Sequence, residues 1–247
     1  MSDGSARSGA DDIVTLHQPE TEGEAAPSKG GSGLAMRIGS SVVLIPPVLA
    51  AVYFGSPYFE ILAVICLALL GIEWARLVQG KIIWVLMGIP YIALPIAAMV
   101  WIRGADGWGL AAFLWLLGVV WATDTGAYAA GRSIGGPKLA PRISPKKTWA
   151  GLLGGMACAM AVGAGAAHWL GQTPVGPLMV VSGVLAVVAQ IGDLFESWVK
   201  RHFNVKDSGS MIPGHGGLLD RMDGLLAAGL ALALLFALTE GGGGAWL

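Results

Sequence analysis

Long apolar runs alternate with short polar connections along most of the chain. Seven such runs, each of about twenty residues, lie near residues 37–55, 58–77, 82–102, 108–129, 149–170, 174–195 and 221–240. About twenty apolar residues are what a helix needs to cross the hydrocarbon core of a membrane. The strict apolar–polar alternation of barrel strands is absent, so we expect helices alone to cross. The pattern predicts an all-α, polytopic transmembrane bundle of about seven spans.

Prolines interrupt two of these runs. Pro46 and Pro47 predict a kink in the first span, because proline removes a backbone hydrogen bond inside a helix. Pro90 and Pro95 leave two alternatives for the third run, which is either one kinked span or a broken pair.

Composition supports a membrane protein. Hydrophobic residues make up 55% of the 247 residues, charged residues only 13%, and the mean hydropathy is +0.67. Soluble domains carry about a quarter charged residues. The formal net charge of −1 argues against nucleic acid as a partner. Cys66 and Cys158 fall inside apolar runs, where they are expected to act as small buried hydrophobic residues.

The first 35 residues differ from the rest. They are polar, acidic and rich in Gly and Ser, and they lack the basic and apolar regions of a signal peptide. Such a segment buries too little apolar surface to offset the entropy of ordering it. We therefore expect a disordered cytoplasmic tail over residues 1–35 and a membrane-embedded domain over residues 36–247.

The basic residues predict the orientation. Given the seven spans, fourteen of the fifteen Lys and Arg residues fall on one side and only Arg103 falls on the other. Loops rich in Lys and Arg stay in the cytoplasm. We expect a multi-pass protein of the inner membrane, with its N-terminus and its long basic loops, around residues 130–148 and 200–221, facing the cytoplasm.

Six acidic residues lie within or at the ends of the runs, where an unpaired carboxylate costs at least a few kcal/mol. Glu73 is expected to pair with Arg76 one helical turn later. Glu60 is expected to reach water at the outer boundary. The remaining four share the cytoplasmic ends of spans four, six and seven, so they could meet in one site: Asp124, Asp193, Asp220 and Asp223.

The connection between spans six and seven gathers groups suited to phosphates. Asp220 and Asp223 are three residues apart at the start of a helix, on one face, and offer the hard oxygen ligands that Mg²⁺ prefers. The first helical turn attracts anions. A glycine-rich turn before it lets backbone amides approach a phosphate closely. Four cations add charge for a nucleotide: Lys200, Arg201, Lys206 and Arg221.

Two blocks of sequence resemble the phosphatidate cytidylyltransferase (CDP-diglyceride synthetase) family. The first runs from Ser197 to Asp223 and contains Lys200-Arg201, Lys206-Asp207, His215-Gly216-Gly217 and Asp220-Arg221-x-Asp223 at the family's spacing. The second contains Asp124-Thr125-Gly126, Gly131-Arg132 and Ser144-Pro145-Lys146-Lys147-Thr148-Trp149. The resemblance covers about the second half of the chain, from span four to span seven, and the first half resembles the family only in being apolar.

This resemblance implies transfer of the cytidylyl group of CTP to phosphatidate, with CDP-diacylglycerol and pyrophosphate as products, for phospholipid synthesis. Mg²⁺, as one or two ions, would be held by Asp193, Asp220 and Asp223. The catalytic residues implied are these three and Lys200. The substrate-binding residues expected are Asp124, Lys146, Lys147, Ser197, Arg201, Lys206, His215, Gly216, Gly217 and Arg221. Membrane lipid is an expected partner, and a homodimer is left open.

The sequence leaves several alternatives open. Ser197 could orient Asp193, four residues earlier, rather than touch substrate. Asp124 could pair with Arg132 or Lys147 as a structural tie. Lys200 and Arg201 could contact anionic lipid headgroups. For the whole chain, the rivals are an ion-coupled transporter, a non-catalytic lipid-binding scaffold, and another transferase that uses CTP or a polyprenol.

Overall fold

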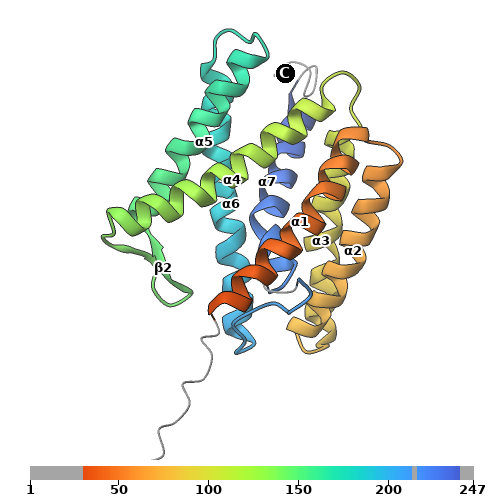
Figure 1. The fold of residues 1–247 in the computed structure, drawn as a ribbon, viewed down its shortest axis with the longest axis vertical. Helices are drawn as coiled ribbons and strands as arrows, with labels where there is room; N and C mark the ends of the chain where they lie inside the picture. Colours follow the sequence, from red (N-terminus) through yellow and green to blue (C-terminus); the bar gives the residue numbers. More distant parts are fainter. Residues whose placement is uncertain (1–29, 213–215, 240–247) are drawn as a thin grey trace, which may run out of the picture.

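The structure is a computed structural model that describes residues 30–212 and 216–239. Within these residues the chain forms seven helices and one short hairpin (Figure 1). The elements are α1 (Gly30–Phe54), α2 (Tyr58–Leu77), α3 (Ile82–Arg103), α4 (Gly109–Ser133), β1 (Lys138–Ala140), β2 (Ser144–Thr148), α5 (Trp149–Trp169), α6 (Gly176–His202) and α7 (Leu219–Leu238). The predicted all-α bundle is confirmed.

Helices α2 to α7 are each long and apolar enough to cross a membrane. The first predicted span lies in α1, whose apolar part, Val42–Phe54, is shorter. Helix α1 begins at Gly30, inside the segment predicted as a tail, and residues 1–29 of that segment lie outside the described residues. Pro90 and Pro95 both lie within the single helix α3, so the third run is one span rather than a broken pair.

The outer surface of the bundle is apolar. Large hydrophobic side chains such as Val64, Ile83 and Val184 are between 57% and 65% exposed. A soluble monomer rarely exposes apolar surface in contiguous patches of this kind, whereas a lipid-facing surface requires it. The chain is therefore an integral, multi-pass membrane protein.

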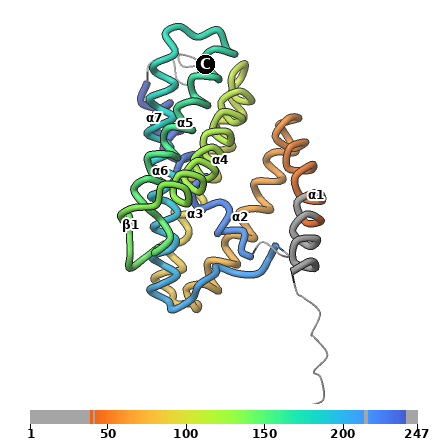
Figure 2. Tube along the Cα trace, turned by 60° about the vertical axis from the view of Figure 1, so that its left-hand side comes forward, coloured from red at the N-terminus to blue at the C-terminus, as the bar shows by residue number. Residues whose placement is uncertain are grey.

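Helix α7 packs against α3, α4 and α6 in the middle of Figure 1 and joins two clusters of buried side chains. Figure 2 shows α1 and α5 on opposite sides of the molecule. Leu232 and Phe236, near its end, pack with α4, α5 and α6. Leu219 and Leu226, nearer its start, pack with α2, α3 and the last turns of α6. The start of α7 is consequently packed on several sides, and this packing fixes the positions of Asp220 and Asp223.

Small residues let the central helices approach closely. A Cβ added at Gly192 of α6 would lie 2.7 Å from the carbonyl oxygen of Asp223 in α7. At Gly126 of α4 it would lie 2.8 Å from the carbonyl oxygen of Gly154 in α5. Glycine at such positions permits backbone-to-backbone packing between membrane helices. The contact at Gly192 brings its neighbour Asp193 up against the first turns of α7.

A hairpin that the apolar pattern does not predict precedes α5. Strands β1 and β2 pair in antiparallel fashion, with Lys138 opposite Thr148 and Ala140 opposite Ser144. Thr148 ends β2 and caps α5, because its Oγ1 accepts a hydrogen bond of 3.0 Å from the amide of Gly151. The cap fixes where the strand stops and the helix begins. It thereby sets the position of Lys147, the residue just before it.

Candidate active site

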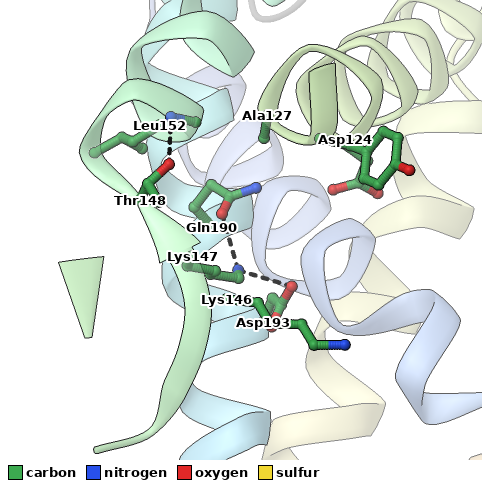
Figure 3. A pocket seen from close by; sticks show the side chains of 10 residues that line it. Asp124, Ala127, Lys146, Lys147, Thr148, Leu152, Gln190 and Asp193 are labelled. Atoms are coloured by element: carbon green, nitrogen blue, oxygen red, sulfur yellow. Dashed lines mark hydrogen bonds and ion pairs between the residues drawn. The ribbon is translucent and has the colours of Figure 1, made fainter. Parts of the chain in front are cut away.

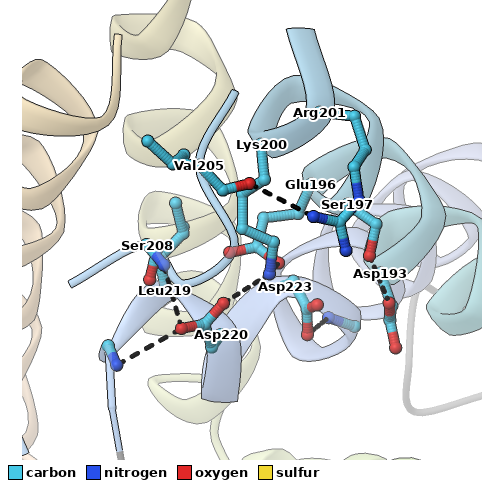
Figure 4. Close-up of polar contacts among 12 residues, drawn as sticks. Asp193, Glu196, Ser197, Lys200, Arg201, Val205, Ser208, Leu219, Asp220 and Asp223 are labelled. Carbon is cyan, nitrogen blue, oxygen red and sulfur yellow. Dashed lines mark hydrogen bonds and ion pairs between the residues drawn. The ribbon is translucent and has the colours of Figure 1, made fainter. Parts of the chain in front are cut away.

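Polar side chains converge at one end of the bundle, where α2 and α6 end and α3 and α7 begin; we call this the site end. Lys200 of α6 is its central cation (Figure 4). Its Nζ lies 2.6 Å from Oε2 of Glu196 and 2.5 Å from Oδ1 of Asp220. The Lys200 side chain is 10% exposed and that of Glu196 only 1%. A lysine this buried is expected to need both carboxylates, because an isolated charge away from water is costly.

Asp220 also organises the backbone that precedes α7. Its Oδ2 accepts hydrogen bonds from the amides of Ser208, at 3.1 Å, and Gly217, at 3.3 Å. Asp220 thus joins three parts of the chain: α6 through Lys200, the segment after α6 through Ser208, and its own helix start through Gly217 (Figure 4). Its position in the first turn of α7 also suits the positive end of the helix dipole.

Asp193 belongs to a neighbouring group of contacts. Its Oδ2 lies 2.7 Å from Nζ of Lys147, which also donates a 2.8 Å hydrogen bond to Oε1 of Gln190 (Figure 3). Ser197 donates from Oγ to Asp193 Oδ1 over 3.2 Å. The structure therefore favours the alternative in which Ser197 orients Asp193. It also shows that Lys147 pairs with Asp193 and not with Asp124.

A pocket of about 190 Å³ opens beside Lys147 between α4, α5, α6 and the end of β2. Its polar lining is formed by Asp124, Lys146, Lys147, Gln190 and Asp193, and its other lining residues include Tyr128 and Gly151. Figure 3 shows the Asp124 carboxylate on α4 across the pocket from the Lys147 contacts. The pocket brings together four residues of the second sequence block with Asp193, which precedes the first block; the four are Asp124, Lys146, Lys147 and Thr148.

Asp223 lies one turn further along α7 than Asp220. Its Oδ1 accepts a 2.7 Å hydrogen bond from the amide of Gly224. The α6–α7 contact at Gly192 places it near Asp193, whereas Asp220 faces Lys200. The two carboxylates of α7 therefore have different partners, although both lie at the site end as expected.

Over residues 30–212 and 216–239, no three His, Cys, Asp or Glu side chains form a group arranged to hold a metal ion. Two of the three predicted ligands are instead paired with lysines, Asp193 with Lys147 and Asp220 with Lys200. The predicted set of Asp193, Asp220 and Asp223 stays a prediction.

The remaining predicted residues lie around this centre. Lys146, Arg201, Lys206 and Arg221 are exposed at the site end. Arg201 donates weakly to the carbonyls of Ile143 and Val205, which ties the end of α6 to the hairpin.

The glycine turn is only partly described. His215 and Gly214 lie outside the described residues. The amide of Gly216 donates to the carbonyl of Ile212, and the amide of Gly217 donates to Asp220. In this arrangement both described amides already serve protein acceptors.

One expected contact is wrong. In the part of the chain that the structure describes, Glu73 forms no ion pair with Arg76. Its carboxylate is 1% exposed and accepts hydrogen bonds from Ser208, Leu218 and Leu219 instead. A spacing of three residues permits an ion pair on an isolated helix, but here Glu73 lies on the buried face of α2 and meets the donors of the segment before α7.

Comparison with known proteins assigns the chain to a family. The model of the cytidylyltransferase family matches residues 78–239, well over half of the chain. The chain belongs to the cytidylyltransferase family. The match begins before α3, so it extends further towards the N-terminus than the two sequence blocks.

Named relatives of this cytidylyltransferase-family chain include proteins called phosphatidate cytidylyltransferase. The one from Brucella suis biovar 1 (strain 1330) is 46% identical over 155 residues, which are 63% of this chain and 57% of that protein. Those from Rickettsia bellii (strain RML369-C) and Rickettsia conorii (strain ATCC VR-613 / Malish 7) are 36% and 35% identical. The Rickettsia alignments cover 81% and 84% of this chain, and 90% and 93% of the relatives. The aligned region spans a little over half of the Brucella protein.

Sequence reasoning about this cytidylyltransferase-family chain missed two polar residues at the site end. Glu196 holds Lys200, and its Oε1 is buried without a hydrogen-bond partner among the described residues. Tyr91 of α3 likewise has a buried hydroxyl without one, and its ring packs 5.0 Å from that of Trp74 and 5.1 Å from that of Phe195. Glu196 carried a usable signal, since it lies three residues after Asp193 and four before Lys200 on one helix. Tyr91 carried none, because a single tyrosine in an apolar run is usually only packed there.

Proposed function

We propose that this chain transfers the cytidylyl group of CTP to phosphatidate, giving CDP-diacylglycerol and pyrophosphate. Family membership and the names of its relatives support the reaction. The observation that carries it is the pairing of two carboxylates with lysines, Asp220 with the buried Lys200 and Asp193 with the partly exposed Lys147, at one end of the membrane helices, where a water-soluble nucleotide and a lipid headgroup can meet.

The pocket beside Lys147 is the proposed site of the CTP phosphates. A triphosphate carries several negative charges, and Lys146 and Lys147 line this pocket. Arg201 and Lys206, which are exposed at the site end, are proposed to bind the outer phosphates, and Arg221, at the start of α7, is proposed to bind the lipid phosphate or the leaving group. Cations placed in this way hold and orient phosphates, which is most of what such a displacement needs.

The carboxylates suit a divalent cation. Asp193, Asp220 and Asp223 supply hard oxygen donors on two helices that touch at Gly192, and Mg²⁺ is bound in proteins by few carboxylates together with substrate phosphates. We propose these three residues as its ligands, for one or two ions. When bound, the ion would neutralise charge on the phosphates. Lys147 and Lys200, which now balance Asp193 and Asp220, would then be released to the phosphates themselves.

The proposed reaction is a single displacement. A phosphate oxygen of phosphatidate forms a bond to the α-phosphorus of CTP, and the bond from that phosphorus to the bridging oxygen of the β-phosphate breaks. Pyrophosphate carries away the electron pair. The attacking phosphate is already ionised, so a binding role rather than proton transfer is proposed for His215, in the same substrate-binding turn as Gly216 and Gly217.

The orientation proposed for the site is cytoplasmic, in the inner membrane. The basic residues of the hairpin, of the end of α6 and of the start of α7 gather at the site end. Arg103 lies at the other end, where it donates from Nε to the carbonyl of Val52 over 2.6 Å. The positive-inside tendency then directs the site end to the cytoplasm, where CTP is found.

Label transfer tests the reaction. Purified chain in detergent would receive phosphatidate, Mg²⁺ and CTP labelled with ³²P at either the α or the γ position. We expect the α label to enter a lipid that runs as CDP-diacylglycerol and the γ label to appear as pyrophosphate. Lipid labelled from the γ position would indicate a kinase, and unlabelled lipid with both substrates present would contradict the proposal.

A further inference from the structure

We propose that Glu73 of α2 is a positioning residue for the active site, which holds the segment before α7 and through it Asp220. Glu73 lies outside the range matched by the family model, in the half of the chain with the weaker resemblance. The catalytic part of this inference, an effect of Glu73 on turnover, rests on the proposed function. The structural part, that Glu73 holds the segment before α7, rests on the contacts alone.

Both oxygens of the Glu73 carboxylate are used. Oε1 accepts from Oγ of Ser208 over 2.7 Å, and Oε2 accepts from the amides of Leu218 at 2.9 Å and Leu219 at 3.0 Å. Leu218 is the residue just before α7 and Leu219 is its first residue, so their amides have no acceptor within the helix. The Glu73 side chain therefore caps the start of α7 from a position 145 residues away in the sequence.

The segment before α7 is pressed against this carboxylate. A Cβ added at Gly209 would lie 3.1 Å from Cδ of Glu73, and one at Gly217 would lie 2.9 Å from the amide nitrogen of Gly209 and closer still to Ser208 Oγ. Only glycine fits at these two points. Ile212 and Gly216 exchange backbone hydrogen bonds of 2.9 and 3.1 Å, which hold these two residues of the segment side by side.

The groups that Glu73 holds are also those that hold Asp220. The Ser208 hydroxyl donates a hydrogen bond to Glu73, and the Ser208 amide donates one to Asp220 Oδ2. Gly217, next to Leu218, gives its amide to the same oxygen (Figure 4). Loss of the Glu73 acceptor would free Ser208 and the first turn of α7 together. Asp220 would then keep its contact with Lys200, but the two amides that orient its Oδ2 atom would no longer be held in place.

The role depends on hydrogen bonding more than on charge. A glutamine at position 73 can still accept from the two α7 amides with its oxygen and donate to Ser208 Oγ with its nitrogen. A methionine of similar size can do neither and would leave buried amides without acceptors. The pair Glu73→Gln and Glu73→Met separates the two effects. Glu60→Met, at the opposite end of the same helix, is the matched control.

Two readouts decide the question in purified protein. Hydrogen–deuterium exchange of peptides covering residues 206–220 measures how firmly the backbone around Asp220 is held. The Mg²⁺ concentration for half-maximal turnover measures how well Asp220 serves the proposed metal site. For Glu73→Met we expect exchange at least tenfold faster and a Mg²⁺ requirement at least tenfold higher, with the KM for CTP within threefold of wild type. For Glu73→Gln and Glu60→Met, the exchange rate, the Mg²⁺ requirement and the KM for CTP should all stay within threefold of wild type.

Two results would overturn the inference. One is Glu73→Met with the exchange rate and Mg²⁺ requirement of Glu60→Met. The other is a loss of folded protein with an unchanged Mg²⁺ requirement per folded molecule, which would indicate a purely structural residue. If Glu73→Met does not fold, Ser208→Ala replaces it, and we expect a two- to threefold shift of both readouts in the same direction. A wild-type chain that makes no product refutes the proposed function, while exchange still decides the role of Glu73.

Discussion

Lys200 of α6 donates to Asp220 of α7 over 2.5 Å, and this contact joins the last turn of one membrane helix to the first turn of the next. The same ammonium is 2.6 Å from Glu196, which is almost fully buried. The pair therefore serves both the site and the fold, because Lys200 is the cation that balances a carboxylate out of reach of water.

Removal of Lys200 should separate these two roles. Lys200→Met leaves the buried Glu196 without the cation that holds it, and the loss of this buried pair is expected to cost about 3–5 kcal/mol of stability. The double variant Lys200→Met/Glu196→Gln also removes the carboxyl group and should recover at least half of the lost thermal stability. Both variants should be inactive. Melting followed by tryptophan fluorescence measures the first effect, and label transfer measures the second.

The control for this pair is Lys138→Met, which removes an exposed lysine of β1 and should melt like wild type. A double variant no more stable than Lys200→Met would mean that Glu196 is not the residue left unbalanced.

Lys147 should affect the use of CTP more than the fold. It lines the pocket and pairs with Asp193, and both side chains retain some exposure, 16% and 35%. Lys147→Met should raise the KM for CTP by at least about tenfold, the effect of losing one charge-assisted contact of roughly 1.4 kcal/mol. Steady-state kinetics at saturating phosphatidate measure this. An unchanged KM for CTP would place the triphosphate elsewhere.

The contact between α5 and α6 offers a test of the fold with a control in the same helix. A Cβ at Gly163 would lie 2.6 Å from the carbonyl oxygen of Leu178 and would press on Ser182, which accepts a buried 3.0 Å hydrogen bond from Trp115. Gly163→Ala should therefore destabilise the protein by about 1–3 kcal/mol. At Gly165 an added Cβ meets nothing within 4 Å, so Gly165→Ala should be neutral in the same melting assay. Equal melting temperatures for the two variants would contradict the packing described here.

The sequence predicted those features that depend on local composition. The apolar runs placed α2 to α7 within about four residues, except that α6 continues to His202, well past the predicted end at residue 195. Of the two alternatives for Ser197, the hydrogen bond to Asp193 is the one that the structure contains. The short hairpin was missed because β1 and β2 are too brief and too polar for a periodic signal. Asp193 and Asp220 were placed at the same end of the bundle, but their lysine partners could not be chosen from spacing.

Glu73 shows where local reasoning stops. Its neighbour Arg76 offers an i+3 ion pair, and nothing near Glu73 in the sequence indicates that α2 will lie beside Ser208 and Leu219. The outcome depends on which face of α2 is buried, and Glu73 lies on that face with Leu70, Trp74 and Leu77. Long-range contacts of this kind come from packing, which only the folded arrangement reveals.

We propose that the carboxylates at the start of α7 bring Mg²⁺ to the phosphates of CTP. The most direct measurement is single-turnover transfer of the α label to phosphatidate, as a function of Mg²⁺, by the wild type, Asp223→Asn and the control Asp106→Asn. Asp106 is exposed in the loop between α3 and α4, far along the chain from the site. We predict that Asp223→Asn slows transfer at least 100-fold at every Mg²⁺ concentration, while Asp106→Asn follows the wild type. Transfer by Asp223→Asn at the wild-type rate and with the wild-type Mg²⁺ dependence would contradict the account.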